Sequence, residues 1–105
     1  MTKGEGNMQI ALAPFKLKHG VAEETLLNTS EEFEHLFVQK QDGILRRILV
    51  RDSDGGYADI VFFEDEKAIE RVLDAEQHSD VCAAFFSIMD DEDSYRVFEV
   101  LKTYE

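Results

Sequence analysis

The stretch GILRRILVRDSDGGYADIVFF, at residues 43–63, constrains the fold more than any other part of this sequence. It predicts a β-hairpin, because the Asp- and Gly-rich residues 53–56 form a turn between two strand-like segments. With the loop centred on this turn, we expect Val50 to lie opposite Asp59, and Ile48 opposite Val61. Side chains of a strand alternate between two faces, and apolar residues here reach both faces of both arms. Both faces of this hairpin therefore need a cover.

The segments around the hairpin predict alternating strands and helices. In order, we predict a strand at 8–19, a helix at 22–40, the two hairpin strands, a helix at 64–75, a second helical piece that Ser79 caps, and a strand at 95–104. This β-α-β-β-α-β order is that of a ferredoxin-like α+β subunit, whose helices cover one face of an antiparallel sheet. Pro14 indicates that the first strand lies at an edge or carries a bulge.

The chain length of 105 residues fits one domain. We place this domain at residues 8–105, behind a flexible N-terminal tail at residues 1–7. Residues 90–94 predict a solvated acidic loop. Apolar side chains at helical spacing predict the buried helix faces. These faces comprise Leu26, Leu27, Ser30, Phe33, Leu36 and Phe37 in the first helix, Ala68, Ile69, Val72 and Leu73 in the second, and Val81, Cys82, Phe85, Phe86 and Met89 in the last.

The helices leave the second face of the sheet without a cover. Exposing its apolar side chains would forfeit about 1.5–3 kcal/mol for each large one, against a typical total stability of roughly 5–15 kcal/mol. Two copies packed sheet to sheet about a twofold axis remove this cost. We therefore expect an obligate homodimer.

Charge and cysteine content exclude several classes of partner. The formal net charge is -12, with 11 Lys+Arg against 23 Asp+Glu, so we expect no nucleic acid partner and no binding to anionic membranes. The single cysteine, Cys82, excludes an internal disulfide and a zinc site built on paired cysteines. We expect it to be buried and inert, and we expect a cytoplasmic protein. The three histidines lack the spacing of a metal site, so we predict none.

The candidate binding residues are aromatic side chains on the predicted inner helix faces, together with one arginine. They are Phe33, Phe37, Arg47, Phe85 and Phe86. Aromatic walls are typical of small-molecule clefts, which predicts a cleft between helices and sheet. The arginine could hold a carboxylate or enolate of a ligand. The structural alternative is an ion pair inside the dimer.

Three residues are candidates for catalysis. His78 could act as a general base or a heme ligand, although an exposed histidine at a helix start explains it equally. Tyr57 and Asp59 could orient a phenolic substrate, or form an interface aromatic and its partner. We expect His35, in the first helix, to border the core.

Four segments resemble a known group of proteins. They are FKLKHGVAEETLL, EEFEHLFVQKQDGILRRILVR, DGGYADIVFFEDEKAIERV and HSDVCAAFFSIMD, which together span roughly residues 15–90. In this order they resemble the dimeric α+β barrel superfamily, within its antibiotic biosynthesis monooxygenase (ABM) group, and most of all its small bacterial branch without an assigned activity. The resemblance implies a β-α-β-β-α-β subunit that dimerises through its sheets.

The resemblance also implies two activities. Cofactor-free oxygenases of the superfamily use Asn, Trp and Tyr around an aromatic substrate, and heme-degrading members use Asn, Trp and His. This chain has no tryptophan and offers only Asn7, Asn28, Tyr57 and His78 as partial matches. We therefore expect a protein that binds a small hydrophobic or aromatic molecule in the cleft without a cofactor. The alternative is a cofactor-independent monooxygenase, or a heme-degrading relative, that acts on an aromatic substrate.

Overall fold

The computed structural model describes residues 7–90 and 95–104. Its elements are β1 (Gln9–Leu17), α1 (Glu23–Leu36), the short 3-10 helix η1 (Val38–Lys40), β2 (Ile44–Arg51), β3 (Tyr57–Phe63), α2 (Glu66–Glu76), α3 (Asp80–Ser87), β4 (Met89–Asp90) and β5 (Arg96–Glu99). The predicted β-α-β-β-α-β order is confirmed, with the last strand shorter than expected. The predicted tail, apart from its last residue, and most of the acidic loop at residues 90–94 lie outside the described residues.

The antiparallel sheet has the order β2-β3-β1, with β4 and β5 both paired to the other side of β1. The prediction that β1 is an edge strand is therefore wrong, and the alternative of a bulge is not seen against β3, because the register runs unbroken through Pro14. On the other side of β1, β5 pairs with Gln9–Leu12 and β4 pairs with Lys16 and Leu17. Pro14 lies in the gap between these two pairings among the described residues, where its missing N–H costs no ladder bond on that side.

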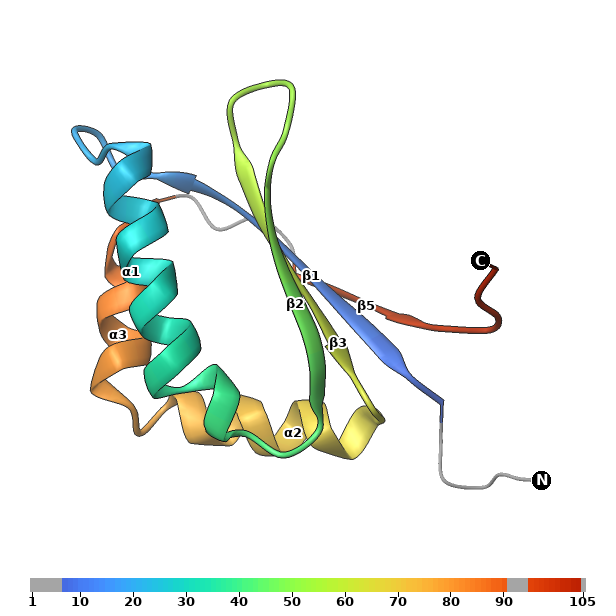
Figure 1. Cartoon of the computed structure of the whole chain (residues 1–105). Helices are drawn as coiled ribbons and strands as arrows, with labels where there is room; N and C mark the ends of the chain where they lie inside the picture. Colours follow the sequence, from blue (N-terminus) through green and yellow to red (C-terminus); the bar gives the residue numbers. More distant parts are fainter. Residues whose placement is uncertain (1–6, 91–94, 105) are drawn as a thin grey trace.

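The helices gather on one side of the sheet, where α1 and α3 run next to each other and α2 crosses near the ends of the hairpin strands (Figure 1). The core lies between these layers. Its buried members include Ala11, Phe15, Leu26, Phe33, Phe63, Val72, Cys82 and Phe85. The helix starts follow local chemistry. Asp65 Oδ1 accepts from the Ala68 N–H at 2.9 Å, and Ser79 Oγ accepts from the Cys82 N–H at 3.2 Å, so the predicted Ser79 cap is confirmed.

Two predicted members of the buried face of α1 are exposed. Leu27 and Leu36 are 53% and 55% exposed, because the buried face follows Leu26, Ser30 and Phe33 at steps of four and three residues, and these two leucines flank it. The prediction that His35 borders the core is also wrong, since its side chain lies in solvent beside Glu31. Leu73 of α2 is likewise exposed, although it touches the rim of the cavity described below.

The hairpin has a register one residue away from the predicted one. Leu49 lies opposite Asp59, and Ile48 opposite Ile60. The cause is the loop, which spans residues 52–56. Its ends are joined by a hydrogen bond from the Asp52 N–H to the Gly56 carbonyl oxygen at 2.8 Å, so the loop is centred on residue 54. This register places Arg47, Leu49, Asp59 and Val61 on the helix-facing side of the sheet.

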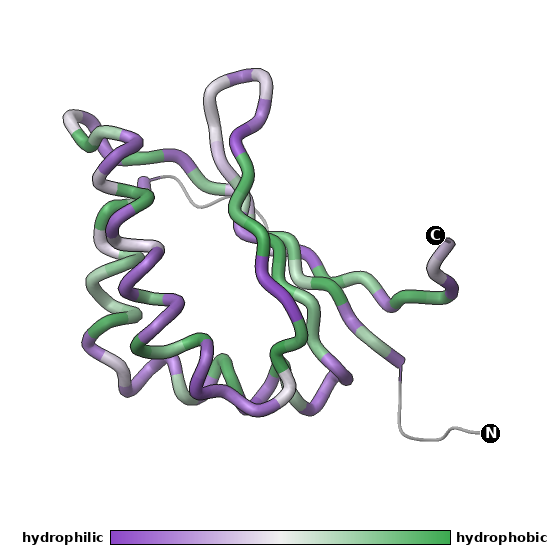
Figure 2. Tube along the Cα trace, in the orientation of Figure 1, coloured by the Kyte–Doolittle hydropathy of each residue, from purple (hydrophilic) through white to green (hydrophobic). Residues whose placement is uncertain are grey.

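The opposite side, here called the outer face, is apolar as expected. Along the outer face, strands β1, β2 and β3 present Ile10, Leu12, Ile48, Val50, Ile60 and Phe62. All six are only partly buried and none belongs to the core. Hydrophobic residues recur along the strands of the sheet (Figure 2). No helix in the described part of the chain is long and apolar enough to cross a membrane.

Candidate functional site

A cavity of about 380 Å³ lies between the inner face of the sheet and the helices. Its walls are mainly apolar and include the rings of six phenylalanines. These are Phe15, Phe33, Phe37, Phe63, Phe85 and Phe86. The polar residues that line it are Arg47, Asp59, Glu76 and Tyr95. The cavity therefore combines a largely aromatic body with a few polar groups, which is the composition of a small-molecule site.

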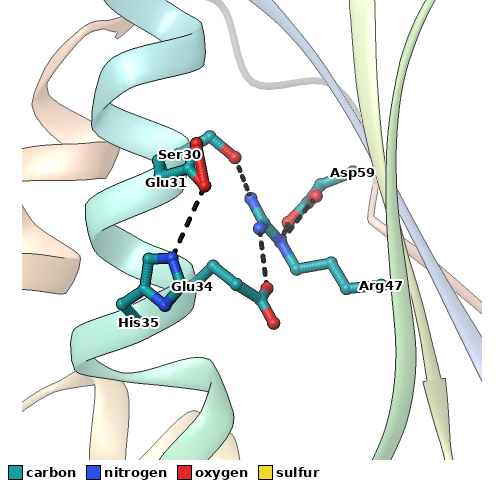
Figure 3. Close-up of polar contacts among 6 residues, drawn as sticks. All are labelled: Ser30, Glu31, Glu34, His35, Arg47 and Asp59. Atoms are coloured by element: carbon teal, nitrogen blue, oxygen red, sulfur yellow. Dashed lines mark hydrogen bonds and ion pairs between the residues drawn. The ribbon is translucent and has the colours of Figure 1, made fainter.

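Arg47 reaches from β2 across the cavity wall to α1 (Figure 3). Its Nε donates to Asp59 Oδ2 at 3.1 Å, Nη1 donates to Glu34 Oε1 at 3.1 Å, and Nη2 donates to Ser30 Oγ at 2.7 Å. The side chain is 7% exposed. Its guanidinium also lies 4.8 Å from the ring centroid of Phe33, within reach of a cation–π interaction. The positive charge is therefore already shared between two carboxylates of the protein.

Asp59 carries the one buried side-chain oxygen that accepts no hydrogen bond among the described residues. The residue is 9% exposed. Its Oδ1 lies 3.0 Å from Arg47 Nε, but the Nε hydrogen bond goes to Oδ2. Burial raises the pKa of Asp59, and the charge of Arg47 opposes that rise. An unpaired buried acceptor costs free energy, so Oδ1 is an unfilled hydrogen-bonding position at the cavity wall.

Glu76, the last residue of α2, lines the same cavity. Within the described ranges its carboxylate forms no hydrogen bond and no ion pair. Burial, and then the negative charge of Asp59, raise the pKa of Glu76 to about 7. Burial also raises the pKa values of Cys82 and Tyr95, with a smaller contribution from the charge of Glu76. A carboxyl group with a pKa close to neutrality can donate or accept a proton under ordinary conditions.

The cavity brings together six of the eight residues that the sequence singled out, Phe33, Phe37, Arg47, Asp59, Phe85 and Phe86. It leaves out Tyr57 and His78. The Tyr57 hydroxyl donates to Glu23 Oε1 at 3.0 Å and so fastens the hairpin to the start of α1. His78 is exposed in the turn before α3, where its backbone N–H donates to the Ala75 carbonyl oxygen at 3.1 Å. The roles expected of these residues in binding or catalysis stay predictions.

Glu76 and the two α1 partners of Arg47, Ser30 and Glu34, are not among the predicted site residues. Helical spacing puts Ser30 on the buried face, but no local pattern pairs it with Arg47. Glu76 follows Val72 by four residues, so helical spacing puts it on the same inward face. That signal was hidden because the predicted helix ended at residue 75, one residue too early.

The described residues offer no suitable ligands for a heme or a metal ion. No histidine lines the cavity in the part of the chain that the structure describes. No group of three His, Cys, Asp or Glu side chains in the described ranges is arranged to hold a metal ion. Among the described residues, the cavity therefore offers no imidazole to ligate a heme iron.

No protein-family model and no curated protein sequence matches this chain. Solved structures do match over most of its length. A mutant of SnoaB, a cofactor-independent oxygenase from Streptomyces nogalater, superposes with a TM-score of 0.75 at 18% identity, covering 93% of this chain and 97% of that one. A proposed antibiotic biosynthesis monooxygenase from Bordetella bronchiseptica gives a TM-score of 0.76 at 12% identity, covering 91% and 99%.

A protein of unknown function from Nitrosomonas europaea matches with a TM-score of 0.69 at 13% identity, covering 97% of each chain. At such identities a structural match shows the fold and leaves the activity open. The fold that the sequence resemblance implied is confirmed: this chain has the α+β fold of the antibiotic biosynthesis monooxygenase proteins.

Proposed function

We propose that this protein binds a small, mainly apolar or aromatic molecule in the cavity between the helices and the sheet. The observation that carries the proposal is the cavity itself, whose volume of about 380 Å³ lies within the roughly 300–1,000 Å³ of ligand pockets. Protein interiors are otherwise close-packed. Six phenylalanine rings line a space that the core leaves unfilled.

The polar groups of the cavity support the same proposal. Burying the charges of Arg47 and Asp59 costs desolvation free energy, and Asp59 Oδ1, which lies within ion-pair distance of Arg47 but accepts no hydrogen bond, adds to that cost. Strongly perturbed ionisable groups in a cavity are typical of functional sites. A ligand that filled the cavity and donated a hydrogen bond to Oδ1 would recover part of the cost.

The test uses 2-naphthylmethanol, a neutral aromatic probe, and measures the melting temperature as the probe concentration rises. We expect a saturable increase, because a ligand that binds only the folded state stabilises it. Ala13→Leu, which places a larger side chain at the cavity wall, should abolish the increase. Ala84→Leu makes the same change on an exposed position of α3 and should preserve it. An equal increase in all three proteins would contradict the proposal, and so would no increase in the wild type with either this probe or its amine counterpart, 2-naphthylmethylamine.

We further propose that the outer face is covered by a second copy of the chain. Six partly buried apolar side chains lie on this face, and packing it against the same face of a second copy about a twofold axis would bury them. Light scattering should give twice the chain mass of 12.1 kDa at micromolar concentration. Ile60→Lys, in the middle of the outer face, should give monomers. Leu27→Lys, a matched change at an exposed position of α1, should leave the dimer intact. A monomeric wild type would refute this proposal.

A cofactor-independent monooxygenase is the second candidate function, and Glu76 is the observation that favours it. A base with a pKa of about 7 beside an aromatic cavity could remove a phenolic proton, and the resulting electron-rich substrate would itself reduce oxygen. The match to SnoaB agrees with this chemistry. Incorporation of ¹⁸O from labelled O₂ into 1,4-dihydroxynaphthalene, above the rate without protein, tests it. Glu76→Gln should lower that rate by roughly 100-fold or more, and an unchanged rate would reject the role of Glu76.

A further inference from the structure

We propose that the cavity selects ligands that carry a protonated amine on their apolar body, and that Asp59 and Glu76 bind this amine. The inference rests on the proposed binding function and adds the chemical class of the ligand. The two carboxyl groups are here called the acidic end of the cavity.

The balance of charge around the cavity supports this choice. The guanidinium of Arg47 already pairs with Asp59 and Glu34 at 3.0 and 3.1 Å. Glu76 adds a further carboxylate, and no second arginine, no lysine and no histidine lines the cavity among the described residues. Of the residues that line the cavity, one cation therefore faces two carboxylates when both are ionised, and Glu34 adds a third carboxylate on Arg47 from α1. A bound carboxylate would meet net negative charge, whereas a bound ammonium group would balance it.

Unfilled hydrogen-bonding positions lead to the same class of ligand. Asp59 Oδ1 is buried and accepts no hydrogen bond among the described residues, and the Glu76 carboxylate has no partner within those ranges. Ionised carboxylates are acceptors only, and an ammonium group offers three donors. A neutral hydroxyl offers one donor, and an ionised carboxylate offers none. Of the three head groups, only the ammonium carries enough donors for both carboxyl groups, and its hydrogen bonds to them would be charge-assisted.

The aromatic walls are also suited to positive charge. The guanidinium of Arg47 lies 4.8 Å from the ring centroid of Phe33 and 5.4 Å from that of Phe85. Ring faces attract cations at these distances. Phe15 and Phe63 line the cavity from the sheet side, so aromatic side chains line both the helix side and the sheet side of the cavity.

The experiment compares three probes that share one aromatic body, by calorimetric titration of the wild-type protein at pH 8. The probes are 2-naphthylmethylamine, 2-naphthylmethanol and 2-naphthoate. We expect the amine to bind at least about tenfold more tightly than the alcohol, which is the order expected of hydrogen bonds to a charged group. The carboxylate should bind most weakly.

Two variants separate charge from general packing. Glu76→Gln keeps the size of the side chain and removes its charge, so the advantage of the amine over the alcohol should shrink while the affinity for the alcohol stays within about threefold. Glu70→Gln makes the same change at an exposed position of α2 and should leave all three affinities unchanged.

The pH dependence gives an independent check. The ionisable groups around Glu76 are Asp59 on β3, Arg47 on β2, Cys82 on α3, and Tyr95, and Glu34 on α1 is paired with Arg47. Because burial raises the pKa of Glu76 to about 7, amine affinity should rise with pH up to that value and then level off, with a shallower rise in Glu76→Gln.

The outcomes separate this inference from the proposed function. Equal affinities for the amine and the alcohol, or an undiminished preference for the amine in Glu76→Gln, would overturn the amine site and leave the binding function standing. Failure of all three probes to bind would overturn both.

Discussion

Arg47 and Arg51 lie on the helix-facing side of β2, with Leu49 between them on that side. Each pairs with a glutamate of α1. Arg51 donates to Glu23 from Nε and Nη2 at 2.8 and 3.1 Å, and its side chain is 61% exposed. Arg47 donates to Glu34 at 3.1 Å and is 7% exposed. Two pairs with nearly the same chemistry therefore lie in opposite surroundings, one in solvent and one at the wall of a cavity.

The difference shows that the buried charges around Arg47 carry a desolvation free energy that the fold itself does not require. An exposed pair contributes only about 0–1 kcal/mol and can fasten the hairpin loosely. A buried pair gains more Coulomb energy but loses hydration, so apolar residues of the same size would often give an equally stable fold. The charges around Arg47 are therefore candidates for binding, whereas those around Arg51 are explained as structural.

The largest effect is expected from Arg47→Met. Removing the guanidinium leaves Asp59 buried without its cation, so the free energy of unfolding should fall by about 3–5 kcal/mol. Urea unfolding at pH 7 measures it. The double variant Arg47→Met, Asp59→Leu removes the stranded charge as well and should recover most of the loss. A single variant as stable as the wild type would show that the buried pair contributes no more than an exposed one.

The next effect concerns Glu76 and depends on pH. Its pKa is about 7 in the folded protein against 4.5 as a reference, so ionisation opposes folding. The neutral Glu76 carboxyl makes its full contribution to the free energy of unfolding below pH 4.5. This contribution is lost as the pH rises through 7. Because water reaches part of this side chain, the loss should be on the order of 1–2 kcal/mol.

Glu76→Gln should therefore melt at a higher temperature than the wild type at pH 8 and at nearly the same temperature at pH 4.5. Glu70→Gln, on the exposed side of α2, serves as the control and should show no such divergence. If the melting temperatures of Glu76→Gln and the wild type differed by the same amount at both pH values, the pKa of Glu76 would not be raised in the folded protein.

The smallest effect is expected from Arg51→Met, the counterpart of the first variant. The free energy of unfolding should fall far less than in Arg47→Met, because solvent screens an exposed ion pair. The loss should shrink further in 0.5 M salt, because screening weakens exposed charges. A loss as large as that of Arg47→Met, in the same urea experiment, would erase the contrast between the two pairs.

The sequence predicted the elements, the Ser79 cap and the aromatic walls, because these depend on local spacing. It did not predict the hairpin register, since that depends on Asp52 joining Gly56 across the loop. A shift of one residue transfers every side chain of a strand to the other face. Arg47 therefore came to lie on the same face as Asp59, a pairing that no local pattern encodes.

Two further misses have similar causes. Leu36 matched the helical spacing of the buried face but lies on its flank, because packing against α3 decides which side of α1 is covered. Glu76 is the last residue of α2. It was not predicted because helix ends are the least certain part of a periodic pattern.

The most direct test of the account is an NMR titration of the Glu76 carboxyl carbon, with and without saturating 2-naphthylmethylamine. We predict a pKa of about 7 in the free protein. The amine should lower it by about one unit or more, since tenfold tighter binding to the ionised form requires such a shift. A pKa near the reference value of 4.5, unchanged by the amine, would contradict the claim that Glu76 is a buried carboxyl that binds an amine in the cavity.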